Sequence, residues 1–171
     1  GGFELLGSDG KPNLTPWTVA NASSDQGKCN KDGKPPVANT GNCAYRSKGS
    51  EGENSKLTQV VDLTGLTPAV GDTLTLNASV TVPATPLAKV KLRVKYSDGT
   101  PTTKVTLELV ENAAYTLITG EAVIASAAVS KIKVSIDNKS LSGKLLVDDV
   151  SVIHTTAGTR LLPLPRLGGQ Q

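Results

Sequence analysis

Two acidic side chains interrupt short apolar runs near opposite ends of the chain. Asp148 lies in the stretch 143–153, which has the pattern of a β-strand, and Glu4 interrupts the apolar run at 1–6. The residues that share the Asp148 face in a strand of period two are Leu146, Val150 and Val152. A carboxylate on such a face is costly to bury unless a cation or several hydrogen-bond donors meet it. The natural partner of the closing stretch is therefore the opening one.

Four motifs give the chain a family resemblance. They are Gly-Phe-Glu at 2–4, Trp17, Gly-Asn-Cys-Ala-Tyr-Arg at 41–46, and Val-Asp-Asp-Val-Ser-Val at 147–152. The chain resembles the bacterial carbohydrate-binding modules of the family four and nine type, which are galactose-binding-like antiparallel β-jelly rolls. The resemblance covers roughly residues 1–154 and implies a fold more strongly than a ligand, because fold does not fix function. A chain that starts within a family motif is expected to be a processed or trimmed product.

The resemblance also implies a structural calcium ion where the first strand meets the last. The carboxylate ligands would be Glu4 and Asp148, with backbone carbonyls from the Gly2 region and from Lys48 to Ser50. Calcium takes several oxygen ligands and mixes carboxylates with carbonyls, so this donor set suits it. The alternative is that Glu4 is solvated and Asp148 accepts hydrogen bonds from backbone amides.

Two cysteines, Cys29 and Cys43, flank a segment rich in Lys, Gly, Asn and Pro. Free thiols in a solvated segment are a liability, so we expect a disulfide, worth about 3 kcal/mol for a loop near this length. A disulfide implies an oxidising compartment, and hence an extracellular or cell-surface protein. The alternative is two unpaired cysteines, or one cysteine turned into the core. The spacing does not fit a zinc site, because the only histidine, His154, is far away.

Aromatic residues would supply the stacking platforms of a glycan site, but they form only 3% of the chain. The candidates are Tyr45, Tyr115 and Trp17. Each also fits a structural role, and Trp17 fits packing in the core. Platforms for tight binding of a neutral sugar are therefore scarce.

A row of cations alternates with apolar residues along the predicted strand 89–96. The row consists of Lys89, Lys91, Arg93 and Lys95. It could meet an acidic polysaccharide. The alternatives are a solvated face, or an edge strand that lysines protect against stray pairing.

Other function classes find little support. The formal charge of +3 is spread along the chain, so there is no nucleic-acid footprint. No apolar run approaches the roughly 20 residues of a membrane span. His154 is the only possible imidazole base and no serine nucleophile motif or phosphate-binding glycine loop accompanies it. The chain is therefore predicted not to be an enzyme.

Hydrophobic alternation predicts nine or ten strands and no helix. The predicted strands are 2–6, 17–20, 44–47, 57–63, 72–82, 89–96, 105–109, 114–124, 131–137 and 144–153. Their spacing is typical of an all-β fold, a two-sheet antiparallel jelly-roll sandwich. One domain is expected at 1–154, with a long polar excursion at 21–42.

The segment 155–171 is a C-terminal extension rich in Pro, Leu and Gly. Two prolines exclude a helix and remove N–H donors from the same edge of an extended chain, so the segment could pair on one side only, as an added edge strand. The residues expected to dock are Leu161, Leu162, Pro163, Leu164, Pro165 and Leu167. The alternative is a linker.

Three functions follow from these features. The first is an extracellular structural subunit that self-associates through its tail into a filament or surface layer, which would make it a homo-oligomer. The second is a non-catalytic carbohydrate-binding module from a larger secreted enzyme or surface protein, with a polysaccharide as partner. The third is a general adhesive or spacer domain. The scarcity of sugar platforms and the edge-compatible tail favour the first.

Overall fold

Ten antiparallel strands form the described part of the chain. The computed structural model describes residues 2–158. Its strands are β1 Thr18–Ala20, β2 Gln26–Cys29, β3 Cys43–Lys48, β4 Ser55–Val60, β5 Thr73–Val82, β6 Ala88–Tyr96, β7 Thr103–Glu108, β8 Asn112–Val123, β9 Val129–Asn138 and β10 Lys144–Thr155. Within this part of the chain, no helix is long and apolar enough to cross a membrane.

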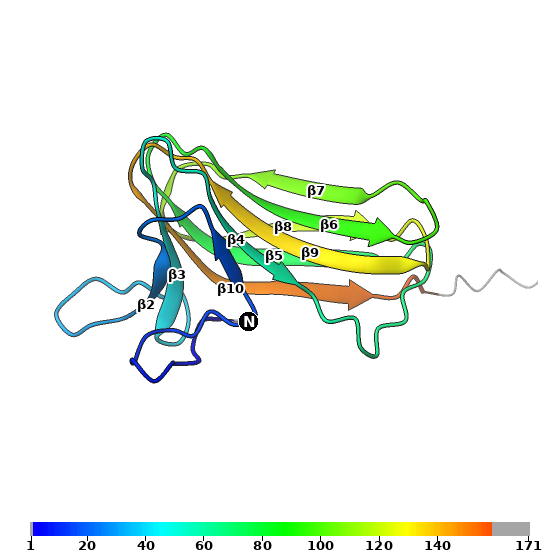
Figure 1. Ribbon diagram of the computed structural model, residues 1–171, viewed down its shortest axis with the longest axis horizontal. Helices are drawn as coiled ribbons and strands as arrows, with labels where there is room; N and C mark the ends of the chain where they lie inside the picture. The colour runs from blue at the N-terminus through cyan, green and yellow to red at the C-terminus, as the bar shows by residue number, and fades with distance from the viewer. Residues whose placement is uncertain (1, 159–171) are drawn as a thin grey trace, which may run out of the picture.

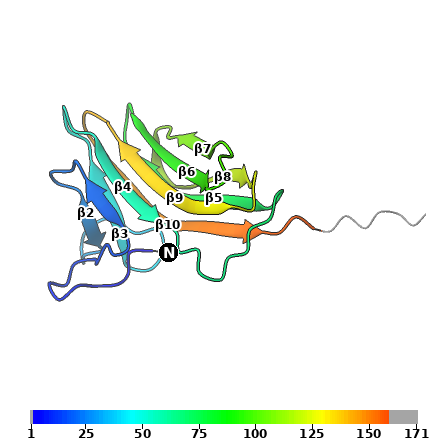
Figure 2. The ribbon, with the colours of Figure 1, turned by 45° about the vertical axis from the view of Figure 1, so that its right-hand side comes forward.

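The strands build two five-stranded sheets that face each other (Figures 1 and 2). One sheet, the β6 sheet, has the order β1-β4-β9-β6-β7, and the other, the β10 sheet, has the order β2-β3-β10-β5-β8. The predicted all-β two-sheet sandwich is confirmed. The order also places β6 and β9 inside their sheet and β7 at its edge.

The core lies between the two sheets and follows from the alternation of each strand. Leu74 and Leu76 of β5 and Val90, Leu92 and Val94 of β6 are at most 1% exposed. The residues between them point outward and are polar or charged. Burial of each such Leu or Val side chain stabilises the fold by about 1.5–3 kcal/mol.

A β-bulge in β10 changes which residues of the closing strand face the core. Asp148 pairs with Ser79 and Ser151 pairs with Asn77, so β10 has one more residue than β5 between these pairs. Asp149, within the bulge, has a left-handed backbone conformation with φ 49°. Asp tolerates this conformation better than most residues.

The bulge corrects the single apolar face predicted for this strand. Leu145 and Val147 face the core before the bulge and Val150 faces it afterwards. Leu146 and Asp148, which precede the inserted residue, point away from the core. The insertion shifts every following side chain to the other face, so Val150 faces the core although it lies an even number of residues after Leu146 and Asp148.

Two strand predictions at the N-terminal end were wrong. Residues 2–6 do not form a strand, apart from one isolated bridge between Leu6 and Pro12. Phe3 is nevertheless buried, 5.9 Å from the ring of Trp17. The strand β2, inside the predicted polar excursion, was missed because Gln-Gly-Lys-Cys has no apolar alternation; its pairing with β3 fixes it at the sheet edge. Of the extension predicted at 155–171, Thr155 ends β10, and the residues predicted to dock, 161–167, lie outside the described residues.

Candidate functional site

A disulfide between Cys29 and Cys43 closes the loop 30–42 at the end of the molecule that holds β2 and β3 (Figure 1). The predicted disulfide is therefore present. Inside the loop, Asn30 Oδ1 accepts the backbone N–H groups of Val37 and Ala38 at 2.7 and 3.2 Å. These bonds order a turn of the loop, which lies beside the outer face of the β10 sheet.

The two aspartates of the bulge hold this loop in place. Asp148 Oδ2 accepts the backbone N–H groups of Asn39 at 2.9 Å and Thr40 at 3.3 Å. Asp149 accepts the side chains of the same two residues, Asn39 Nδ2 at 2.8 Å and Thr40 Oγ1 at 2.6 Å. Asp148 is 0% exposed although it points away from the core, because the loop covers it. Burial raises the pKa of Asp148, and the hydrogen bonds it accepts oppose that shift.

Glu4 anchors the other end of the loop. Its carboxylate accepts the backbone N–H groups of Asn42 and Cys43, both at 3.0 Å. A Cβ atom on Gly2 would lie 3.4 Å from Asp148 Oδ1 and 3.7 Å from Glu4 Oε1. The opening and closing stretches therefore meet, as the sequence predicts.

The four predicted calcium ligands are not brought together. Lys48 pairs with Lys144, whereas Tyr45 pairs with Val147, beside Asp148. Lys48 is three positions along the strand from Tyr45, a rise of about 10 Å, and Ser50 lies further along the same segment.

The oxygen atoms assembled around Glu4 and Asp148 are therefore fewer than a calcium ion needs. The two carboxylates accept five backbone N–H groups, from Asn39, Thr40, Asn42, Cys43 and Asp149. Calcium needs six to eight oxygens, and among residues 2–158 no cluster of three or more His, Cys, Asp or Glu could hold a metal. Calcium at this position stays a prediction, with Glu4 and Asp148 as its only assembled carboxylates.

The aromatic candidates for sugar stacking take structural positions. Tyr45 is 1% exposed, packs 5.9 Å from the ring of Phe3, and donates its hydroxyl to Asp25 at 3.2 Å. No sugar can reach a ring buried in this way, so Tyr45 is excluded as a platform. Trp17 is half-buried against the core. Tyr115 is half-buried and donates its hydroxyl to Val37 O at 2.6 Å, which ties β8 to the disulfide loop.

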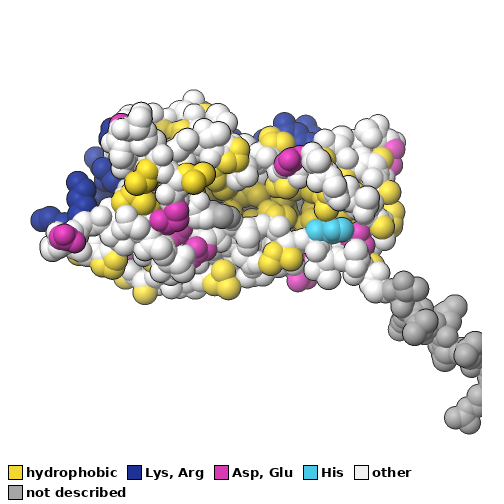
Figure 3. Space-filling model, turned by 90° about the horizontal axis from the view of Figure 1, so that it is seen from below, with side chains coloured by type: hydrophobic (Ala, Val, Ile, Leu, Met, Phe, Trp, Pro, Cys, Tyr) yellow, Lys and Arg dark blue, Asp and Glu magenta, His cyan; other side chains and the backbone are white. Residues whose placement is uncertain are grey.

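A cationic pocket lies between the disulfide loop and the outer face of the β10 sheet. Its volume is about 260 Å³, and all of its charged residues are cations. The cations are Lys28, Lys31, Lys34, Arg46 and Lys144, and the remaining lining residues are Cys29, Pro35, Val37 and Leu146. Figure 3 shows basic side chains gathered at the end of the molecule where this loop lies.

The cations of this pocket are crowded and only partly satisfied. Burial lowers the pKa of Lys28, and the charges of Arg46 and Lys31 lower it further. Arg46 donates from Nη2 to Ser24 O at 3.2 Å, while its Nε is buried without a hydrogen-bond partner. An anion in the pocket would relieve both the mutual repulsion and the missing acceptors. Sequence reasoning missed this site, because its cations come from three segments that only the fold brings together.

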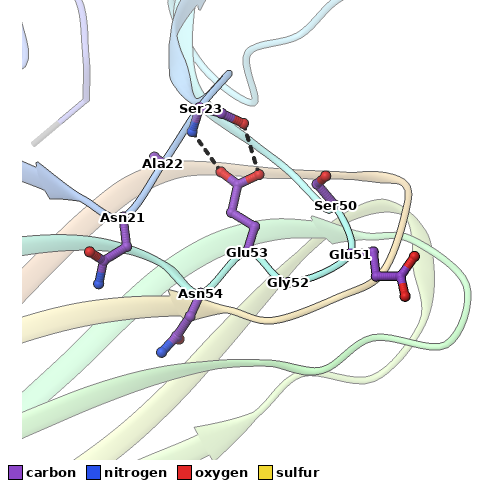
Figure 4. Close-up of a pocket in the computed structure, with 8 residues that line it drawn as sticks. All are labelled: Asn21, Ala22, Ser23, Ser50, Glu51, Gly52, Glu53 and Asn54. Carbon is purple, nitrogen blue, oxygen red and sulfur yellow. Dashed lines mark hydrogen bonds between the residues drawn. The ribbon is translucent and has the colours of Figure 1, made fainter.

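A second, shallower depression lies between the turn before β2 and the loop from β3 to β4 (Figure 4). Its lining is polar and contains two carboxylates, Glu51 and Glu53. Glu53 points toward Ser23 and accepts its backbone N–H at 2.8 Å and its hydroxyl at 3.0 Å. The depression offers hydrogen-bonding groups but no aromatic ring, and we regard it as the weaker candidate.

His154 takes part in a clamp at the end of β10. Its Nε2 lies 2.7 Å from Asp72 Oδ2, and Figure 3 shows this histidine beside acidic side chains. Asp72 also accepts the backbone N–H groups of Ala69 and Ala157, both at 2.8 Å. These bonds lower the pKa of Asp72, those from Ala157 and Ala69 most strongly. The pair joins the last strand to the loop before β5.

Comparison with known proteins identifies relatives by fold. No family model and no curated protein matches the chain. Among solved structures, the enzymatically active domain of bacteriophage CBA120 tailspike protein 4 matches with a TM-score of 0.64 at 10% identity. That match covers 84% of this chain, which spans only 20% of the tailspike domain's length.

Two carbohydrate-binding modules match over almost their whole length. TmCBM61, solved with β-1,4-galactotriose, has a TM-score of 0.58 at 19% identity, covering 90% of this chain and 94% of the module. The CBM22-1 xylan-binding domain of Paenibacillus barcinonensis Xyn10C has a TM-score of 0.55 at 14% identity, covering 91% and 92%. The resemblance predicted from the sequence is confirmed for the fold: the chain has the β-sandwich fold of carbohydrate-binding modules.

Proposed function

We propose that the chain is a non-catalytic carbohydrate-binding module whose glycan site is the cationic pocket beside the disulfide loop. The fold supports this class, since modules of the same architecture match over nine-tenths of the chain. The structural-subunit hypothesis rested on the scarcity of sugar platforms, which the burial of Tyr45 makes greater, and on docking residues at 161–167, which lie outside the described part of the chain. The fold gives that hypothesis no support of its own. The module hypothesis is therefore the better supported of the two.

The convergence of five cations on one pocket is the observation that carries the proposal. Sugar hydroxyl groups and carboxylates both accept hydrogen bonds from Lys and Arg, and Arg can bind a carboxylate with two parallel bonds. The apolar side chains of Pro35, Val37 and Leu146 offer a surface for the C–H face of a sugar ring. Because all charged lining residues are positive, the ligand is a glycan that carries acid groups.

The environment implied by the disulfide agrees with this ligand class. A structural disulfide forms and persists in oxidising compartments, so we place the protein outside the cell or on its surface. Acidic glycans are available there as polymers. The partner is therefore a polysaccharide, and no protein partner is required.

Affinity electrophoresis through gels that contain single polysaccharides tests this function. Polygalacturonate and dextran sulfate serve as the acidic ligands, and dextran and xylan serve as the neutral ones. We expect retardation in the acidic gels only. Migration unaffected by every polysaccharide would overturn the proposal, and retardation by neutral gels alone would move the site away from the cationic pocket.

A further inference from the structure

The outer face of the β6 sheet carries a second concentration of positive charge. Strands β4, β9, β6 and β7 lie side by side in this sheet (Figure 2), and each turns cations outward. The cations are Lys56, Lys89, Lys91, Arg93, Lys95, Lys104, Lys131 and Lys133. The carboxylates on the same face are Glu108 and Asp137. This face, which we call the cationic face, thus concentrates charge in a chain whose formal net charge is only +3.

The two halves of the cationic face differ in how their charges are balanced. In the first half, Lys89 pairs with Glu108 at 3.2 Å. Asp137 serves both Lys91 and Lys56, the latter at 3.9 Å. Acids and bases alternate across these strands, as is usual for a solvated sheet surface.

The second half of the face contains cations without acidic partners. Arg93 of β6 lies directly opposite Lys104 of β7 on one side and Lys133 of β9 on the other. Lys95 lies opposite Lys131. Side chains in directly opposite positions have Cβ atoms about 4.5–5.5 Å apart, and like charges there destabilise a sheet. Within residues 2–158, no ion pair joins any of these five cations to a carboxylate.

The titration of Lys133 reflects this crowding. Burial lowers the pKa of Lys133, and the positive charges of Arg93, Lys131, Lys56 and Lys95 lower it further. Lys133 therefore has a reduced preference for its charged form. A negatively charged ligand on the face would reverse that effect.

Protection of a sheet edge does not explain the cluster. Lysines often guard exposed edges against pairing with other chains. However, β6 lies between β9 and β7, and β9 lies between β4 and β6, so neither strand is an edge. Of the five unpaired cations, only Lys104 lies on an edge strand. The edge alternative raised for the row on β6 is therefore excluded by the strand order.

We propose that the unpaired half of the cationic face, formed by Arg93, Lys95, Lys104, Lys131 and Lys133, is a second binding surface for an acidic polysaccharide. The cationic pocket lies on the outer face of the other sheet, so the two sites are on opposite sides of the sandwich. Two separate sites would let one module bridge two polymer strands, or hold one polymer with higher avidity. The proposal rests on the glycan-binding function, but its site is distinct.

The other side chains of the face favour a polysaccharide over other polyanions. The neutral residues turned outward are Thr58, Val60 and Thr106, together with Ser135, which is only 5% exposed. None is an aromatic ring on which single-stranded nucleic acid could stack. Val60 is the only apolar residue among them, and one valine is too little to insert into a membrane interface. Hydroxyl groups and ammonium groups on a broad, open sheet suit a hydroxylated polymer with acid groups.

The test compares charge-neutralising variants of matched size. The face variant is Arg93→Gln with Lys133→Gln, and the pocket variant is Lys31→Gln with Lys34→Gln. The control, Lys89→Gln with Lys139→Gln, removes the same charge from two lysines that lie outside the pocket and outside the unpaired half of the face. Binding to polygalacturonate is measured by calorimetry over a range of salt concentrations, with dextran, an oligodeoxynucleotide and anionic lipid vesicles as further probes.

The expected result is a loss of affinity of about tenfold in the face variant, with a shallower dependence on salt, because two ionic contacts are removed. The melting temperature of this variant should stay the same or rise, since the repulsion between the two opposite cations is removed. The control should bind as the wild type does.

Wild-type affinity in the face variant would overturn the second site, even if the pocket variant is weakened. Tighter binding of the oligodeoxynucleotide or the vesicles than of polygalacturonate would overturn the assignment to a glycan. Binding to dextran but not to polygalacturonate would overturn the second site and leave a glycan-binding function in place.

Discussion

Asp148 Oδ2 accepts the backbone N–H of Asn39 at 2.9 Å, which ties the closing strand to the disulfide loop across 109 residues of chain. The bond explains why an acidic residue occupies an otherwise apolar strand: it holds the wall of the cationic pocket. Two aspartates divide this task, since Asp148 binds the backbone of the loop and Asp149 binds its side chains.

Asp148→Ala should lower the free energy of unfolding by about 1–3 kcal/mol, because it leaves part-buried backbone N–H groups of Asn39 and Thr40 without acceptors. Urea unfolding measures this change. Asp149→Asn is the control, since Asn also tolerates the left-handed backbone at this position, and its effect should be smaller because the hydrogen bonds of Asp149 are exposed. Equal stability of Asp148→Ala and the wild type would show that the loop does not depend on this anchor.

A chelator separates the two accounts of Glu4 and Asp148. The family resemblance predicts that removal of calcium lowers the melting temperature and that Asp148→Asn abolishes this sensitivity. The five backbone N–H groups already bound to the two carboxylates predict an unchanged melt. We expect the second result from thermal melts with and without EDTA. A fall that disappears in the Asp148→Asn variant would instead establish a cation site.

Removal of the disulfide should affect both stability and binding. Reduction, or the double change Cys29→Ser and Cys43→Ser, should cost about 3 kcal/mol for a loop near this length. It should also weaken binding to polygalacturonate, because the loop carries Lys31 and Lys34 into the pocket. The free energy of unfolding and the affinity can be measured on the same sample. Full affinity after reduction would show that the pocket forms without the covalent link.

The Asp72 clamp should make stability fall at acid pH. Its hydrogen bonds hold the folded-state pKa below the ordinary value of 3.8, so its contribution is complete above that pH and is lost as the pH falls through the folded-state value. Asp72→Asn should therefore lower the melting temperature at pH 7, and the difference from the wild type should shrink toward pH 2. Because the shift of Asp148 has the opposite sign, the comparison of the two proteins is needed to isolate Asp72. A difference that stays constant with pH would contradict the role of the charge.

Much of the fold could be predicted from the sequence, because the alternation of apolar and polar residues in β5, β6 and β9 leaves one arrangement that buries Leu76, Leu92 and Val134. The disulfide could also be predicted, since the segment between its cysteines is too polar to bury free thiols. The bulge in β10 could not, because period two is broken by one residue and the sequence does not mark where. The cationic pocket could not either: Lys28, Arg46 and Lys144 lie on three different strands, and only strand pairing brings them to one place.

The most direct test of the central proposal is calorimetric titration of polygalacturonate into the wild type, the variant Lys31→Gln with Lys34→Gln, and the control Lys89→Gln with Lys139→Gln. The cationic pocket predicts that the wild type and the control bind with the same affinity and that the pocket variant binds about tenfold more weakly, with a smaller dependence on salt. Equal affinity of all three proteins, or no binding by the wild type, would contradict the assignment of the glycan site.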